Sequence, residues 1–298
     1  MDERRLNVFV EVARRLSFAG AARTLRLSQP SVSAHVAALE RELGAQLFER
    51  TTRRVRLTAA GEALLARAET LLRDHAEARR AVAAADERID GNLTVAASLT
   101  IGGYVLPAAL ARLVAAHPAL QVRVTIQNTE QVVRALSEGR ADVGFVEGGL
   151  VSPGVVLHPL REDELVVIAP AGHPFAGLRE VPLEELARAP FVLREEGSGT
   201  RQVAETHLRA AGFDPAGLRV VAELSSIDAI KACVAAGLGV SIVSRSVLPA
   251  GGDADGLVAR RIEGLKLTRR LAAATLRSAP PLPAVRRLLD LLGAELAA

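Results

Sequence analysis

The sequence predicts an α/β protein made of a small helical head, a long helix and two α/β lobes. Three observations support this organisation. Residues 17–33 combine two short helical segments with a tight turn between them. Apolar residues over 64–89 then repeat with heptad spacing, and from Gly91 onward strand-like and helix-like segments alternate.

The bulk composition is that of an ordinary soluble protein. The chain has 298 residues, of which 49% are hydrophobic and 24% charged, which suits about two or three domains. No apolar run approaches the roughly 18 residues that span a bilayer, and no apolar segment follows the charged start of the chain, as a secretory signal would require. We therefore expect a cytoplasmic protein with no membrane partner. A single cysteine, Cys233, excludes an internal disulfide and a multi-cysteine zinc site.

Three helices are predicted in the head from apolar residues at helical spacing. They cover 4–16, 18–25 and 29–43. Ser17 and Ser28 stand where a hydroxyl caps the second and third helices. Two short helices joined this tightly are typical of a helix-turn-helix.

The third of these helices has two contrasting faces. Its apolar stripe should face the core and consists of Val32, Val36, Leu39 and Leu43. The opposite face is small and polar, so it can enter a DNA major groove without steric conflict. It consists of Pro30, Ala34, Ala37 and Arg41, flanked by Ser31 and Ser33. A face that is merely solvated would carry long charged side chains instead. The pattern therefore favours a recognition helix.

A basic hairpin is predicted directly after the helices. Val55 and Leu57 alternate with Arg54 and Arg56, which indicates a short hairpin with a Thr/Arg tip. The first 60 residues hold 11 arginines and 6 acidic residues, a net charge of +5, whereas the remainder has a net charge of −2. A basic head on a near-neutral body suggests a polyanion partner, and such a wing would contact phosphate or the minor groove. The alternative is an ordinary solvent-exposed hairpin.

A long linker helix is predicted from the cap residue Thr58 to about Ile89. Its apolar seam sustains a heptad spacing for more than three heptads, which argues for pairing with the same helix of a second chain. His75 in this seam is interpreted as a packed or rim residue, because no second metal-binding side chain stands near it. The seam consists of Leu64, Ala68, Leu71, His75, Ala78, Val82, Ala85 and Ile89.

Strand and helix patterns alternate through the rest of the chain, which predicts parallel sheets with helices on both faces. Two α/β lobes joined by crossing connections would enclose a cleft, the usual place for a small ligand. The expected strands are 93–97, 122–127, 141–146, 165–169, 191–193, 218–224, 240–243 and 269–276. The expected helices are 103–117, 130–138, 201–211, 227–236 and 284–296. The expected domains are a head at 1–58, the linker at 59–90, lobe one at 91–163 with 265–298, and lobe two at 164–264.

Two segments have the composition of helix starts that bind an anion. One follows the first strand of lobe one at 98–103, and the other follows a strand of lobe two at 196–201. Each supplies hydroxyls and backbone N–H donors, and Arg201 adds a fixed positive charge. The alternative is that these hydroxyls only cap their helices. Including polar residues at other strand ends, the candidate effector-binding residues are Ser98, Thr100, Gln127, Asn128, Glu147, Ser198, Gly199, Thr200, Arg201 and Ser226.

Motifs of enzymes are missing from the sequence. The segment 197–199 is not a G-x-S-x-G nucleophile elbow, and 237–239 precedes a predicted strand instead of following one, as a dinucleotide-binding fingerprint must. The six histidines are scattered, without metal-ligand spacing. We therefore expect neither catalytic nor metal-binding residues.

The first 60 residues closely resemble the LysR-type transcriptional regulators, and the remainder fits the family in order. The resemblance implies a winged helix-turn-helix, dimers through the linker helix, and usually a homotetramer that bends promoter DNA. It also implies that a small effector, bound in a two-lobed domain similar to periplasmic binding proteins, alters that bend. The matching residues are Phe9, Ser17-Phe18, Ala21-Ala22, Leu25, 28–33, Leu39-Glu40, Leu43-Gly44, Leu47-Phe48, Arg50, Arg53, Leu57-Thr58 and Gly61. The resemblance places Ser28, Gln29, Pro30, Ser31, Ser33, Arg50, Arg53 and Arg54 at double-stranded DNA.

The segments 97–102 and 195–201 are also similar to a subgroup that regulates sulfur assimilation and carbon-dioxide fixation. This similarity implies an anionic effector such as sulfite, sulfate or a phosphorylated metabolite, and no other cofactor. Two alternatives remain open from the sequence. One is a solute-binding protein with an added helical head, and the other is a cytoplasmic enzyme fused to a DNA-binding domain.

Overall fold

The computed structural model describes residues 2–50, 55–85, 88–148, 152–249, 253, 255–278 and 280–296. The chain divides into two compact units, 1–81 and 82–298. No helix among the described residues has the length and apolar character needed to cross a membrane.

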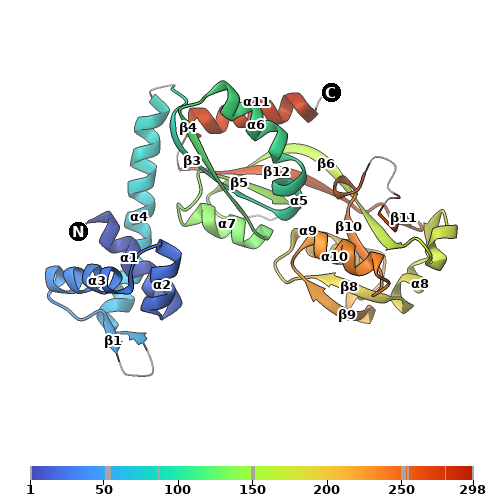
Figure 1. The fold of residues 1–298 in the computed structure, drawn as a ribbon, viewed down its shortest axis with the longest axis horizontal. Coiled ribbons are helices and arrows are strands. Elements are labelled where there is room, and N and C mark those ends of the chain that lie inside the picture. Colours follow the sequence, from blue (N-terminus) through green and yellow to red (C-terminus); the bar gives the residue numbers. More distant parts are fainter. Residues whose placement is uncertain are drawn as a thin grey trace. The chain divides into compact units, whose positions relative to one another are not determined.

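Three helices form the head, α1 (Glu3–Arg15), α2 (Phe18–Leu25) and α3 (Gln29–Leu43) (Figure 1). The Ser17 and Ser28 hydroxyls accept hydrogen bonds from backbone N–H groups at 3.0 and 3.3 Å, as capping requires. The predicted helices are thus confirmed to within a residue. Their contacts bury a core around Phe9 and Phe48, whose ring centroids lie 5.4 Å apart.

The apolar stripe of α3 lies in this core, with one exception. Val32, Val36 and Leu39 are fully buried. Leu43 was expected in the same stripe, but it is 40% exposed. It is the last residue of α3, which ends there at Gly44 in the left-handed conformation.

The wing is an antiparallel pair, β1 (Phe48–Arg50) and β2 (Val55–Leu57). Its tip, with Arg53 and Arg54, lies outside the described residues. The Glu40 carboxylate anchors the wing to α3 by accepting the Leu47 and Phe48 backbone N–H groups at 2.9 and 3.3 Å.

The linker helix α4 (Ala59–Ala85) starts at Thr58, whose hydroxyl accepts the Gly61 N–H at 3.0 Å. Only glycine fits at 61, because a Cβ there would lie 2.2 Å from the Leu47 carbonyl oxygen. The helix ends before Ile89, where the sequence had predicted its end. Ile89 instead packs against the core of the second unit.

The residues of the predicted heptad seam of α4 lie in two different environments. Ala68 is fully buried and Leu64 is partly buried, and both pack on the head's own core. Leu71 and Val82 are 42% and 74% exposed. His75 forms an ion pair with Glu3 at 3.3 Å. The first residues of the seam therefore pack on the core of the head, whereas further along the helix large apolar side chains are exposed.

The described part of the second unit contains one large mixed sheet, with the strand order β4-β3-β5-β12-β6-β11-β7 and with β10 paired to β6. Its strands are β3 (Gly91–Ala97), β4 (Leu120–Ile126), β5 (Val143–Glu147), β6 (Val155–Pro170), β7 (Glu180–Val181), β10 (Ser241–Ser244), β11 (Leu257–Ile262) and β12 (Thr268–Leu276). A separate parallel pair in lobe two consists of β8 (Pro190–Arg194) and β9 (Arg219–Leu224).

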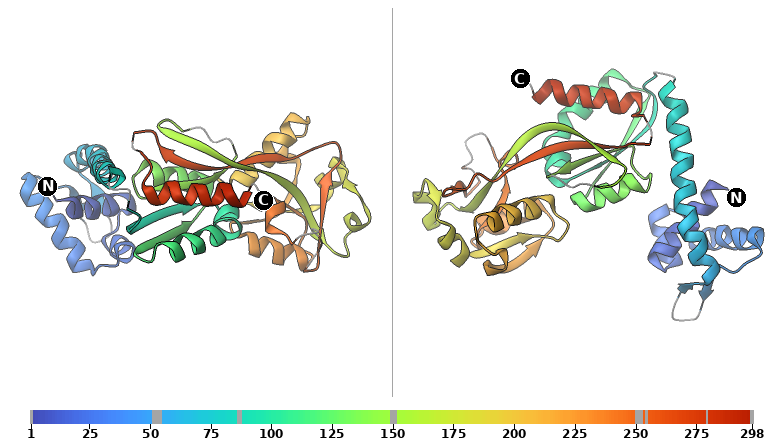
Figure 2. Two further views of the ribbon diagram at one scale, coloured as in Figure 1. Left: turned by 90° about the horizontal axis from the view of Figure 1, so that it is seen from above. Right: turned by 180° about the vertical axis from the view of Figure 1, so that it is seen from behind.

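The expectation of parallel sheets is confirmed only in part, because the large sheet is mixed. Strands β3, β4 and β5 are parallel, but β12 runs antiparallel to both β5 and β6. Strand β12 lies beside the first part of β6, Val155–Glu164, and the two strands carry the chain between the lobes (Figure 2). Only the apolar end of β6 was predicted from the sequence, because its first ten residues mix charged and apolar side chains.

Helices cover the sheets of both lobes. The predicted helix at 103–117 is split into α5 (Leu99–Tyr104) and α6 (Leu106–Ala116), because Pro107 cannot donate the hydrogen bond that would continue α5. The other helices are α7 (Thr129–Ser137), α8 (Leu183–Arg188), α9 (Gly199–Ala210), α10 (Ile227–Ala235) and α11 (Pro283–Leu296), with short 3-10 turns at Pro174–Gly177, Pro215–Gly217 and Arg245–Val247.

Candidate effector site and DNA-binding face

A buried ionic cluster joins the two lobes where β5, β6 and β12 lie together. Its centre is Arg269, whose side chain is completely buried. The guanidinium donates to Glu147, and its Nε donates to Asp163 Oδ2 at 2.7 Å. It also donates to the hydroxyls of Thr100 and Thr200, at 3.1 and 2.9 Å. One cation thus holds two buried carboxylates and a hydroxyl from each lobe.

The Glu147 carboxylate accepts hydrogen bonds from Thr100 and Thr200, which were both predicted to bind the effector. Besides the Arg269 guanidinium, it accepts the Thr100 backbone N–H at 3.0 Å and the Thr200 hydroxyl at 3.1 Å. Burial raises the pKa of Glu147, but the charge of Arg269, the hydrogen bond from Thr100 and the charge of Arg194 outweigh burial and hold this pKa below its usual range. The carboxylate is therefore ionised near neutral pH.

Asp163 completes the cluster on the side of β6. It accepts the hydroxyls of Ser244 and Ser246 at 2.7 and 2.8 Å, in addition to Arg269. Neither Asp163 nor Arg269 was among the site residues predicted from the sequence. The available signal was a charged residue at each point where an apolar strand pattern begins, as in 163–169 and 269–276. Such residues are rarely buried unless they are paired.

The other predicted hydroxyl and amide residues divide into helix caps and unbonded groups. Asn128, Ser198 and Ser226 cap α7, α9 and α10, by accepting backbone N–H groups at 3.0, 3.4 and 3.2 Å. Ser98 precedes α5 without a capping hydrogen bond, and its buried Oγ has no hydrogen-bond partner among the described residues. The Nε2 of Gln127 is buried and unbonded in the same sense. Ser98 and Gln127 therefore keep hydrogen-bonding capacity for a ligand.

Arg201, a predicted effector-binding residue, is bonded to groups of lobe two. Its guanidinium donates to Glu205 at 2.8 Å, to Glu223 at 3.0 Å and to the Arg194 carbonyl oxygen at 3.1 Å. The hydrogen bond to Glu205 is the main reason why the pKa of Arg201 is raised. Arg269, and not Arg201, supplies the cation of the buried cluster.

The two lobes approach each other closely at Gly199. A Cβ at this position would lie 2.6 Å from Thr129 Oγ1 and 2.7 Å from the Glu147 carbonyl oxygen. The start of α9 therefore packs directly on the end of β5. Beside this contact lies a cavity of about 460 Å³ lined by Glu147, Gly148, Gln202, Val203, Thr206, His207, Thr268, Arg269 and Arg270.

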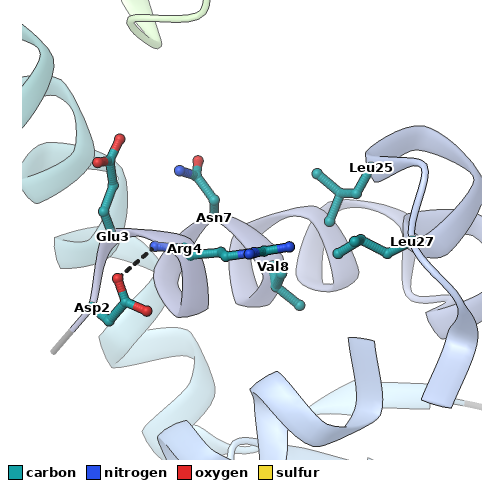
Figure 3. A pocket seen from close by; sticks show the side chains of 7 residues that line it. All are labelled: Asp2, Glu3, Arg4, Asn7, Val8, Leu25 and Leu27. Carbon is teal, nitrogen blue, oxygen red and sulfur yellow. Dashed lines mark hydrogen bonds between the residues drawn. The ribbon is translucent and has the colours of Figure 1, made fainter. Parts of the chain in front are cut away.

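A second cavity, of about 340 Å³, lies in the head between the start of α1 and the turn after α2 (Figure 3). Leu25 and Leu27 form its apolar side, and Asp2 accepts the Arg4 backbone N–H at 3.2 Å on the other side. None of the predicted effector residues lines this cavity.

The predicted DNA-binding face is presented by the start of α3. Ser28, Gln29 and Pro30 are exposed, and Ser31 and Ser33 are partly exposed. The hairpin contributes Arg50 at the end of β1, but only its backbone is described. The face keeps the small side chains that entry into a groove requires.

Comparison with known proteins identifies both parts of the chain. Residues 4–62 match the family described as bacterial regulatory helix-turn-helix protein, lysR family, and residues 86–297 match the LysR substrate binding domain. The transcriptional regulator CysL of Bacillus subtilis is 36% identical to this chain, over 82% of this chain and 80% of CysL.

Two solved structures are similar along most of their length. The regulatory domain of CcmR from Synechocystis, in complex with 2-PG, is 29% identical with a TM-score of 0.63, covering 69% of this chain and 97% of that one. Full-length CbnR in complex with its target DNA is 26% identical with a TM-score of 0.64, covering 98% and 99%. The chain is therefore a member of the LysR family, a DNA-binding transcription regulator with an effector-binding domain.

Proposed function

We propose that this regulator responds to a small oxyanion bound between the lobes by Ser98, Thr100, Thr200 and Arg269, next to Glu147. The observation that carries the proposal is a set of buried donors already arranged around a carboxylate, with the unbonded Ser98 hydroxyl beside them. Groups that bind the two oxygens of a carboxylate also suit the oxygens of sulfite, sulfate or a phosphate monoester. The CcmR domain bound to 2-PG supports an anionic effector.

The residues that should contact promoter DNA are Ser28, Gln29, Pro30, Ser31 and Ser33 on α3, with Arg50, Arg53 and Arg54 on the wing. The DNA-bound CbnR structure supports this assignment. Homodimers should form through α4, where Leu71 and Val82 leave large apolar side chains exposed, and two dimers should form a tetramer. A dimer carries two DNA-binding heads, so the operator should contain two half-sites.

We further propose that the protein acts in the cytoplasm, where bacterial promoter DNA lies, and that it regulates without catalysing a reaction. The named relatives are regulators, so they favour neither the solute-binding nor the enzyme alternative. The effector would be its only small-molecule ligand.

A thermal-shift panel of sulfite, sulfate, phosphate and 2-phosphoglycolate with the full chain tests the effector assignment. A ligand at about a hundred times its Kd adds about 2.7 kcal/mol of stability, so at least one anion should raise the Tm by about 5–10 °C. Thr100→Val should lose this shift, because it removes the hydroxyl that contacts Arg269 at the site.

The matched control is Thr125→Val, which changes an exposed residue of β4 in the same lobe. This variant should keep the full anion-induced shift. The proposal is refuted if no anion raises the Tm of the parent chain, or if Thr100→Val responds to the anion as the parent does.

A further inference from the structure

The buried cluster between the lobes has more negative than positive side chains. Glu147 and Asp163 share the single cation Arg269. The nearby Arg194 is buried too, but its guanidinium donates twice to Glu195, at 2.8 and 3.0 Å. On the other sides, Arg161 of β6 donates to Ser246 at 3.0 Å, while His207 and Arg270 line the adjacent cavity with Glu147.

An oxyanion that binds here must share its donors with the Glu147 carboxylate. The Thr100 N–H, the Thr200 hydroxyl and the Arg269 guanidinium all donate to Glu147 already. A second set of anionic oxygens at these donors would lie within hydrogen-bond distance of the carboxylate, in a site from which water is largely excluded. Two like charges so close disfavour each other strongly.

A proton between the two anions reverses this repulsion. An ionised carboxylate only accepts hydrogen bonds, so it pairs well with an oxyanion that carries an O–H group. The resulting O–H···O⁻ bond is among the stronger hydrogen bonds in proteins. An oxyanion without a proton leaves the same carboxylate facing a bare negative oxygen.

Resting on the function proposed above, we propose that Glu147 determines the specificity of the site and selects a protonated oxyanion, such as a phosphate monoester or hydrogen sulfite, over sulfate. Phosphate monoesters lose their second proton near pH 6, so they can bring a proton into the site around neutrality. Sulfate is fully deprotonated there and cannot donate to the carboxylate. Of the anions that the sequence left open, the proposal favours hydrogen sulfite and phosphate monoesters and disfavours sulfate.

Isothermal titration of the full chain with inorganic phosphate and with inorganic sulfate, both near pH 6, tests this inference. The two ions have the same tetrahedral shape and differ in protonation and hence in net charge, because phosphate near pH 6 carries protons and sulfate carries none. The parent chain should bind phosphate at least about tenfold more tightly than sulfate, since a site built to pair with an O–H group rejects the analogue that lacks it. Glu147→Gln should bind sulfate at least about tenfold more tightly than the parent does, because the amide can donate to sulfate and removes the negative charge.

Glu185→Gln is the matched control, since it makes the same charge change at an exposed residue of α8, and it should keep the parent's preference. Equal affinities of the parent for the two ions, or a Glu147→Gln variant with the parent's preference, would overturn the inference and leave the oxyanion site standing. A different result would contradict the proposed function. In that case neither the parent nor Glu147→Gln would bind phosphate, sulfate or any other anion of the thermal-shift panel.

The parent chain alone provides a second test, which does not depend on the folding of the variant. Binding of sulfate should take up one proton from solution, because Glu147 must then become protonated. The sulfate affinity should therefore rise about tenfold for each pH unit that the pH is lowered while the free carboxylate is ionised. An affinity for sulfate that is measurable and independent of pH would contradict the role of Glu147.

Discussion

Replacing Arg269 by methionine is expected to lower the free energy of unfolding by about 3–5 kcal/mol, the usual cost of removing one partner from a buried ion pair. The substitution leaves the Glu147 and Asp163 carboxylates buried without their common cation. Urea denaturation of the full chain measures the change. The neighbouring Arg270 is exposed on the same strand, so Arg270→Met should change the stability by no more than about 0.5 kcal/mol.

The effect of Arg269→Met should also depend on pH. Arg269 and the hydroxyl neighbours lower the pKa of Glu147 in the folded chain, so this interaction stabilises the protein above the ordinary glutamate pKa of 4.5 and is lost as the pH falls through the folded pKa. The gap in stability between parent and variant should therefore narrow in acid. Equal stability of the two proteins at neutral pH would show that the cluster does not hold the lobes together.

Placing a carboxylate on the recognition face should abolish specific DNA binding. Ser33 lies one helical turn into α3, partly exposed, beside the exposed Gln29 and Pro30. The side chain introduced by Ser33→Glu would fill the groove and repel the phosphates on either side. We expect the affinity for the operator to fall by a factor on the order of 100 or more, measured by fluorescence anisotropy on the chain's own upstream region.

Ser137→Glu provides the same change of charge at a partly exposed serine at the end of α7, in the other unit. It should bind the operator as the parent does. Unchanged operator affinity of Ser33→Glu would mean that α3 does not enter the groove through this face.

The head was predicted closely because its signals are local. Ser17 and Ser28 cap the helices that they precede, and the stripe from Val32 to Leu39 is buried as its spacing indicates. Strand β12 was predicted to within one residue, but only the apolar end of the long strand β6 was predicted, because the first ten residues of β6 mix charged and apolar side chains. Antiparallel pairing of such strands depends on residues far apart in the chain, which local patterns do not report.

The candidate site was predicted in part for the same reason. Thr100, Glu147 and Thr200 were recognised at helix starts and strand ends and do lie together. Arg269 joins them only because β12 pairs with β5 and β6. Ser98 and Ser198 occupy equivalent positions in the sequence pattern, yet only Ser198 caps its helix. Whether a serine caps or stays unbonded is decided by tertiary packing.

The most direct test of the account is the operator affinity of the full chain, measured by anisotropy with and without the anion that gives the largest thermal shift. Coupling between two sites changes affinity by about 5–150-fold in typical regulators. We expect a change within this range in the parent chain and no change in Thr100→Val. An anion that binds the parent with full thermal shift but leaves its operator affinity unaltered would contradict the central claim that the oxyanion site controls DNA binding.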